Sequence, residues 1–359
     1  MSLSVLKKYL FPLIFVFGAV VFIARNLYLS NRPLIKPFDL LYDDQSSKVL
    51  KKIAPPLNLD FSKAQTLSSL ETVPRYLVYH SQTGQVYFAK NATDVFMPAS
   101  FTKLMTAQVA LDLVPLETKI TATKDSVNKE PTILEMKVGE KFTVAELLRG
   151  TIATSANDAA QTLADGAAQE SGLKPKDFIH LMNVKTKALG LTKTQFANPD
   201  GLDSQYQFST LTDLAQIIHN VQVNYPEIVA VGQSDRQDIE ANDEHSRYYL
   251  PNWNGLLGVY PGVNGLKIAY TEGAGYSTIV TASQSGIPLV AIVSGTGSYL
   301  ERDLAVADLL DAAYIQEKVS PQKITKNQLN NHYKVWGDLA RQIQAEIKAL
   351  KESTQSATP

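Results

Sequence analysis

Residues 98–107, PASFTKLMTA, carry the pattern from which we interpret the rest of this 359-residue chain. They place Ser100 and Lys103 three residues apart at the start of a predicted helix that Pro115 ends. This spacing leaves the two side chains about 60° apart on one helix face, close enough to touch. A lysine with a lowered pKa can take the proton of a serine hydroxyl, which is otherwise a weak nucleophile. The spacing alone is more typical of a capping serine followed by a surface lysine.

Two further short stretches favour the chemical interpretation. Ser155-Ala156-Asn157 lies between two helical segments, where it is either a polar turn or a second hydroxyl with a substrate-binding amide. Lys267 lies on a strand-like run, where it either protects a sheet edge or supplies a positive charge to a site. A Ser-x-x-Lys motif, a Ser-x-Asn-type element and a Lys-Thr-Gly motif form the signature of penicillin-binding proteins and serine β-lactamases.

The segments around these motifs predict an α+β fold. Two short strand-like runs at 76–79 and 85–88 flank a turn and form a predicted hairpin. Several helices follow; Thr143 to Glu146 is a capping box, and Ser209 is the predicted cap of another helix. Three more strand-like runs then precede a last helix of the domain. We expect the N-terminal hairpin to join the C-terminal strands in one sheet.

From about Tyr76 to Tyr314, the chain resembles the low-molecular-mass penicillin-binding proteins, the serine D-alanyl-D-alanine carboxypeptidase family. The resemblance rests on the whole set of motifs, which is specific although each member is short. Its members are PASFTKLMTA, Gly139-Glu140, Leu147-Leu148, SANDA at 155–159, NPDGL at 198–202, Ser209-Thr210, Gly265-Leu266-Lys267 and TEGAGY at 271–276. The resemblance implies a β-lactamase/transpeptidase-like fold, in which helices flank an antiparallel sheet and an all-helical subdomain accompanies it.

The resemblance also implies a role for each matching residue. Ser100 looks like the acylated nucleophile and Lys103 like its general base. Ser155 would relay protons, and Asn157 would bind the substrate backbone. The oxyanion hole would use the N–H groups of Ser100 and Tyr270, and Lys267 would contact the carboxylate region of the substrate. The implied reaction is removal of the terminal D-Ala from peptidoglycan stem peptides through an acyl-enzyme, with β-lactams as inhibitors and no cofactor.

The third motif departs from the family pattern, because Lys267-Ile268-Ala269 replaces Lys-Thr-Gly. If side chains alternate along a strand, Lys267 and Ala269 share one face and Ile268 lies on the other. Ile268 could then pack into the core; otherwise it removes a hydroxyl from the site. A lost hydroxyl partner of a substrate charge costs about 1.5–3 kcal/mol. Three alternatives therefore stay open: a peptidoglycan-binding pseudo-enzyme with impaired turnover, a D,D-endopeptidase, and a β-lactamase-like hydrolase.

The N-terminal sequence is typical of a signal anchor or a signal peptide. Tyr9 to Ala24 lacks charged side chains and follows Lys7 and Lys8. Arg25 and Asn26 interrupt the run before Leu27 to Leu29; taken as one helix, Tyr9 to Leu29 is about 31 Å long, enough to cross a bilayer core. We favour an uncleaved anchor in the bacterial cell membrane over a cleaved signal peptide, with the catalytic domain outside the cytoplasm, or secreted if cleavage occurs. The expected organisation is 1–29 signal anchor or signal peptide, 30–70 linker, 71–316 catalytic domain and 317–359 helical C-terminal tail.

The composition of the chain argues against several kinds of partner and reactive group. Thirty-four basic and 35 acidic residues give a net charge of −1, which argues against a nucleic-acid partner. The chain has no cysteine, so a thiol nucleophile is impossible. Its five histidines show no paired metal-ligand spacing, and we expect no metal site.

Overall fold

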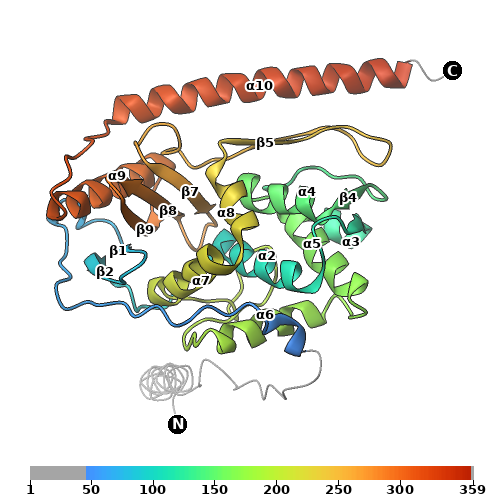
Figure 1. The fold of residues 1–359 in the computed structure, drawn as a ribbon. Helices are drawn as coiled ribbons and strands as arrows, with labels where there is room; N and C mark the ends of the chain where they lie inside the picture. The colour runs from blue at the N-terminus through green and yellow to red at the C-terminus, as the bar shows by residue number, and fades with distance from the viewer. Residues whose placement is uncertain (1–45, 357–359) are drawn as a thin grey trace, which may run out of the picture. The chain divides into compact units, whose positions relative to one another are not determined.

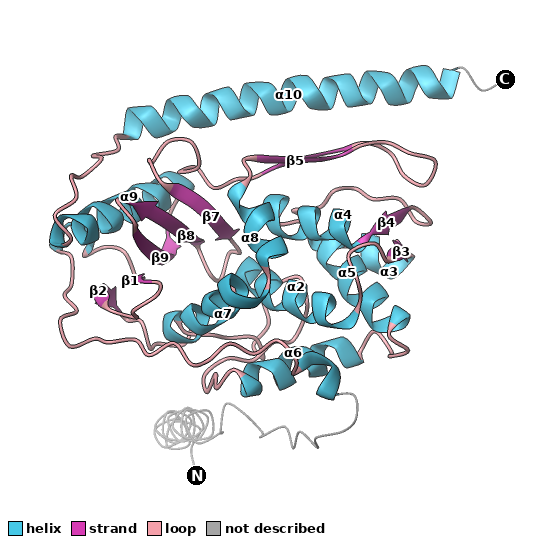
Figure 2. Cartoon of the chain, in the orientation of Figure 1, coloured by secondary structure: helices cyan, strands magenta, loops and turns pink. Residues whose placement is uncertain are grey.

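The computed structural model describes residues 46–356 and confirms the predicted α+β fold (Figure 2). Five antiparallel strands form one sheet in the order β2-β1-β9-β8-β7, so the N-terminal hairpin does join the C-terminal strands. The predicted membrane anchor lies outside the described residues. Within 46–356, no helix is both long enough and apolar enough to span a bilayer. The strands of the sheet are β1 (Arg75–His80), β2 (Val86–Lys90), β7 (Val263–Ala269), β8 (Tyr276–Gln284) and β9 (Ile287–Thr296).

The sheet separates two packing environments. On one face, Val78, Val280 and Val293 pack in a buried cluster with Val306 and Leu309 of α9 (Tyr299–Gln316). On the other face, β7 contacts α8 and the turn that precedes α2, and β1 contacts α7 (Figure 1). Because side chains alternate along a strand, residues one position apart on β7 point to different environments.

A helical subdomain lies on this second face. Its central helix, α2, buries every residue from Thr102 to Ala110, which explains why the predicted helix there has no polar face. The capping box predicted at Thr143 and Glu146 is present. The helices are α2 (Thr102–Leu113), α3 (Lys124–Val127), α4 (Val144–Arg149), α5 (Asn157–Glu170), α6 (Asp177–Ala188), α7 (Leu211–Asn224) and α8 (Pro226–Gln233). Two short two-stranded sheets accompany them: β3 (Lys119–Thr121) with β4 (Lys141–Thr143), and β5 (Arg236–Ile239) with β6 (Tyr248–Pro251).

The predicted cap of α7 is wrong by one residue. The side chain of Thr210, not that of Ser209, accepts the N–H of Asp213. The Ser209 hydroxyl lies 2.9 Å from the Thr194 hydroxyl, and the Ser209 backbone pairs with Phe96. Ser209 is therefore held in a bridge ahead of the helix.

Residues 46–57, assigned to the linker from sequence, lie against the helical subdomain. The side chains of Asn220 and Gln216 on α7 accept the N–H groups of Ala54 and Leu57, both at 2.7 Å. Lys185 of α6 donates to the carbonyls of Val49 and Lys52 at 3.3 and 3.2 Å. This part of the chain therefore belongs to the same packed unit as the helices.

The amine of Lys185 also lies at the centre of a buried polar cluster. It is 2.5 Å from both the Asp112 carboxylate and the Tyr225 hydroxyl, and neither Lys185 nor Asp112 has more than 1% of its side chain exposed. We expect Lys185→Met to lower the free energy of unfolding by about 3–5 kcal/mol, because it leaves the Asp112 charge buried without its partner. Urea denaturation measures this loss. Lys174→Met, an exposed lysine, is the control; a loss no larger than that of the control contradicts the prediction.

The C-terminal helix α10 (Lys326–Ser356) lies within the tail that was predicted to be helical. Thr325 and Gln328 form a reciprocal cap, in which each side chain accepts the other's N–H. The helix packs on α9 and β6 and buries Leu329, Ala340 and Ile343, whereas Val335 is 63% exposed. The chain thus carries a helix beyond α9 that covers part of the domain surface.

Candidate active site

Ser100 and Lys103 meet at the N-terminus of α2. Ser100 lies in the single turn η3 (Ala99–Phe101), which leads directly into the helix, and its side chain is partly exposed. The Lys103 amine donates to the Ser100 hydroxyl at 3.0 Å. The contact predicted from the three-residue spacing is therefore present, and the serine remains accessible from solvent.

The amine of Lys103 is fully buried and bonded on every side. Its other acceptors are the Asn157 side-chain oxygen at 2.6 Å and the main-chain carbonyl of Asp200. Burial lowers the pKa of Lys103 to about 7, although the negative charges of Asp200 and Asp158 oppose the shift. At neutral pH, a large share of this lysine is uncharged and able to accept a proton from Ser100.

The second motif brings Asn157 into the site through an unusual turn. Gly150–Thr154 forms a π-helical turn that ends at Ser155, whose backbone is left-handed (φ 66°). Asn157 then begins α5; its N–H bonds the Thr132 carbonyl at 2.7 Å, and its amide group donates to the Glu130 carbonyl at 2.8 Å. These contacts fix the Asn157 amide against Lys103, so Asn157 also positions the Lys103 amine.

Asp158 is a structural residue. Its carboxylate accepts the N–H groups of Leu134, Met136 and Ala159 at 2.8–3.3 Å. Burial raises its pKa in spite of these bonds. The side chain thus holds the segment ahead of the second motif and offers no free oxygen to a substrate.

A loop between α6 and α7 closes the site behind Lys103. Gly201 has a φ of 90°, and a Cβ there would lie 2.2 Å from the Ala99 carbonyl oxygen, so only glycine fits. Asp200 pairs with Lys129 at 3.3 Å, which ties this loop to the segment ahead of the second motif. Sequence reasoning noted the loop as a landmark but missed the Asp200 carbonyl as an acceptor for Lys103.

The third motif lies beside Ser100, because β7 packs against η3. Lys267 is 1% exposed, and its amine donates to the Ile268 carbonyl at 2.9 Å. Burial, together with the charges of Lys103 and Arg302, holds the pKa of Lys267 well below its ordinary value. The site thus gathers three buried basic side chains, and sequence reasoning missed Arg302.

Arg302 is held in place by its neighbours on α9 and α10. Its guanidinium pairs with Asp303 at 2.7 Å and lies 3.1 Å from the Tyr333 hydroxyl. Tyr333 also donates to Asp303. These contacts fix one full positive charge close to the third motif.

The two residues that depart from the family pattern in the third motif, Ile268 and Ala269, lie on opposite faces of β7. Lys267 pairs across the sheet with Ile279 and Ala269 with Ser277, so both point toward the helical subdomain. Ile268 pairs with Thr278 on the other face and is only half-buried. The alternation expected from the sequence is present, but Ile268 stays at the sheet edge and is not part of the core.

Tyr270 follows the last residue of β7. Its ring is 49% exposed and lies tilted by 33° against the Tyr276 ring, with 4.3 Å between centroids. The turn beyond it is tied to the opposite side of the site, because the Asp203 carboxylate accepts the Thr271 hydroxyl at 2.6 Å and the Gly273 N–H at 3.1 Å. The N–H of Tyr270 therefore belongs to a strand end whose position is fixed on both sides.

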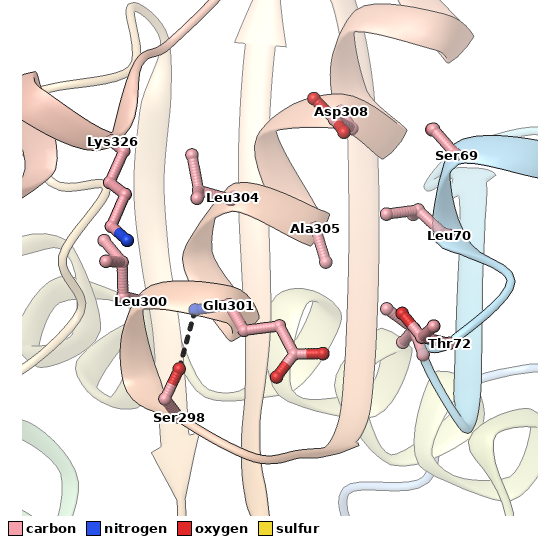
Figure 3. A pocket seen from close by; sticks show the side chains of 11 residues that line it. Ser69, Leu70, Thr72, Ser298, Leu300, Glu301, Leu304, Ala305, Asp308 and Lys326 are labelled. Atoms are coloured by element: carbon pink, nitrogen blue, oxygen red, sulfur yellow. Dashed lines mark hydrogen bonds between the residues drawn. The ribbon is translucent and has the colours of Figure 1, made fainter.

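A separate pocket of about 310 Å³ lies between α9 and the short turn η2 (Ser68–Leu70) (Figure 3). Its polar side chains include Glu301, which accepts the Gly297 N–H, and Ser298, which caps α9. None of the predicted site residues lines it. The pocket therefore offers no route to Ser100.

Comparison with known families and curated proteins gives two similarities. The family model Peptidase_S11, D-alanyl-D-alanine carboxypeptidase, matches residues 65–298. The chain is 34% identical over 254 residues to the D-alanyl-D-alanine carboxypeptidase DacC of Escherichia coli, which covers 66% of this chain and 60% of the relative. The chain spans about three fifths of the length of the first curated relatives that it matches.

Two solved structures share the fold. The Streptomyces K15 DD-transpeptidase is similar with a TM-score of 0.62 and 26% identity, over 68% of this chain and 97% of that one. Penicillin-binding protein D2 of Listeria monocytogenes, in its cefotaxime-bound form, is similar with a TM-score of 0.58 and 27% identity, over 73% of this chain and 100% of that one. The predicted transpeptidase-like fold is confirmed.

Proposed function

Because the chain belongs to the Peptidase_S11 family of D-alanyl-D-alanine carboxypeptidases, we propose that it removes the terminal D-Ala of peptidoglycan stem peptides by acyl transfer to Ser100. The observation that carries the proposal is the 3.0 Å contact between the Ser100 hydroxyl and a buried lysine with a pKa of about 7. An accessible serine beside a buried amine that can be neutral suits nucleophilic attack on an amide.

The proposed reaction has two half-reactions. In the first, Lys103 takes the hydroxyl proton as the Ser100 oxygen attacks the carbonyl carbon, and the N–H groups of Ser100 and Tyr270 receive the oxyanion. The proton then passes to the leaving nitrogen, with Ser155 as the proposed relay, and D-Ala departs. In the second, water attacks the ester and returns the proton to Ser100.

The charge of the site supports recognition of a peptide that ends in a carboxylate. Burial holds the pKa of Lys267 below its ordinary value, and repulsion from the charges of Lys103 and Arg302 adds to the shift. A substrate carboxylate would relieve the repulsion and favour the charged form of Lys267. The same argument extends to β-lactams, and the similar Listeria protein is described in a cefotaxime-bound form.

A second candidate is a peptidoglycan-binding protein that is acylated but turns over poorly. The replacement of Lys-Thr-Gly by Lys267-Ile268-Ala269 favours it, because Ile268 has no hydroxyl and Ala269 adds a methyl group on the buried face. The assay that separates the two candidates measures D-Ala released from a Lys-D-Ala-D-Ala peptide. We expect repeated turnover; acylation that stops after one equivalent of D-Ala establishes the second candidate instead.

We also propose that the protein is anchored in the cell membrane with its catalytic domain outside the cytoplasm. The support is the uncharged stretch behind Lys7 and Lys8, which lies outside the described residues. We expect the full chain to sediment with membranes and to be degraded when protease is added to intact spheroplasts. A chain without residues 1–29 is the control. A full chain in the soluble fraction, or one protected from protease, contradicts the proposal.

A further inference from the structure

A groove of about 770 Å³ separates α10 from the body of the domain. One wall is the helix itself, with Ala340, Gln344 and Ile347 facing the opening. The opposite wall is β6 and the residues around it, including Tyr249 and Trp253. The volume lies within the range of small-molecule and oligomer sites in proteins. Figure 1 shows α10 running past the β5–β6 pair, which it contacts through β6.

The inner side of this groove is formed in part by residues that adjoin the second motif. Thr154, which lines it, immediately precedes Ser155 and donates to the Pro251 carbonyl at 3.1 Å. Thr132 also lines it, and its carbonyl accepts the Asn157 N–H. None of Ser100, Lys103 and Lys267 lines the groove. An occupant would therefore lie next to the proposed catalytic residues without contacting them.

The lining combines aromatic faces with polar groups. Trp253 and Tyr249 are half-buried, and Trp253 meets Trp336 of α10 at 6.2 Å between ring centroids. Gln344, Arg341 and Arg247 supply hydrogen-bonding groups, and the Arg247 Nε–H makes no hydrogen bond within the described part of the chain. Arg341 and Arg247 already pair with Asp338 and Asp238, but a lipid chain would offer no partner to the Gln344 amide or to the Arg247 Nε–H. A sugar ring suits them, because it has one apolar face for an aromatic ring and a rim of hydroxyl and acetamido groups.

We propose that this groove binds the glycan strand of peptidoglycan, a polymer of β-1,4-linked N-acetylated amino sugars, next to the stem peptide that is held at Ser100. The proposal rests on the proposed function, because a stem peptide held at Ser100 is covalently attached to that glycan. The helix α10 lies beyond the residues that the family model matches, so the wall it contributes is an addition to the matched domain.

The chain carries its own reporter for this site. It has two tryptophans, Trp253 and Trp336, and they contact one another at the groove. We titrate the full chain with a peptide-free tetrasaccharide of alternating N-acetylglucosamine and N-acetylmuramic acid while recording tryptophan emission. We expect a saturable change that the Ser100→Ala chain shows equally. Binding is read without any turnover, so absence of carboxypeptidase activity does not affect the result, and absence of glycan binding leaves the proposed function standing.

Two residues of α10 make a matched pair for the test. Both glutamines are exposed, but Gln344 lines the groove, whereas Gln342 does not line it and bonds Glu346. We expect Gln344→Ala and Tyr249→Ala each to weaken tetrasaccharide binding, by about tenfold for the aromatic residue, and Gln342→Ala to bind as the parent does. Thermal unfolding shows whether each variant is folded.

Three results overturn the proposal. One is an emission that does not change with the tetrasaccharide; another is an equal loss in the Gln344→Ala and Gln342→Ala chains. The third is a stem peptide without sugars that produces the same saturable change and competes with the tetrasaccharide, because the groove would then bind peptide.

Discussion

Replacing Ser100 with alanine is expected to abolish covalent labelling by a fluorescent penicillin. The release of D-Ala should fall on the order of 10⁶-fold, the loss seen when the nucleophile of a serine protease is removed. The reason is that the chain has no cysteine, and Ser100 is the hydroxyl that the buried amine of Lys103 contacts. Labelling is read on a gel after denaturation, which leaves only the covalent ester visible.

Ser69→Ala is the control for this substitution, since Ser69 is exposed and lines the pocket between η2 and α9. It should label as the parent protein does. Ser100 is partly exposed at the start of α2, and its replacement by alanine removes one small polar group, so the thermal midpoint should change little. Persistent labelling of a folded Ser100→Ala chain would show that another residue is the nucleophile. The proposed function would then lose its basis.

The parts of the site that sequence alone predicts are those governed by local geometry or by a specific motif. Ser100 and Lys103 share one helical turn, so their contact follows from the helical period. Asn157 and Lys267 are 54 and 164 residues from Lys103, and only a resemblance to a known family could place them in one site. The Asp200 acceptor is a main-chain carbonyl, which every residue carries, and its side chain therefore gives no signal.

The fold likewise has elements that the sequence predicts and elements that it does not. The strands β7, β8 and β9 are seven to ten residues long and carry readable apolar patterns. The pairs β3–β4 and β5–β6 have three or four residues per strand, too few for a period to appear, and they were not predicted. Arg302 was missed because an arginine on a helix is usually a surface residue. Its burial depends on contacts with Asp303 and with Tyr333 of α10.

Lys103 is the residue whose protonation should set the pH dependence of acylation. Its pKa is lowered to about 7 by burial, and the unprotonated form is the base. The rate of penicillin acylation should therefore rise about tenfold per pH unit below that value and level off above it. Lys103→Arg should remain protonated at every accessible pH, because the guanidinium pKa exceeds about 12. We expect it to acylate 10²–10⁴-fold more slowly, roughly the contribution of a general base.

The two measurements together distinguish a base from a structural cation. If the buried charge of Lys103 only held Asn157 and Asp200 in place, Lys103→Arg would keep that charge, and the parent rate would not rise between about pH 6 and pH 8. Lys103→Met removes both the charge and the base, and the Asn157 oxygen then loses its 2.6 Å donor. Slow acylation by a folded Lys103→Arg chain, with the pH-dependent rise lost, assigns proton transfer to this amine. A flat profile for the parent protein excludes that assignment, because a group with a pKa of about 7 must change its charge within this range.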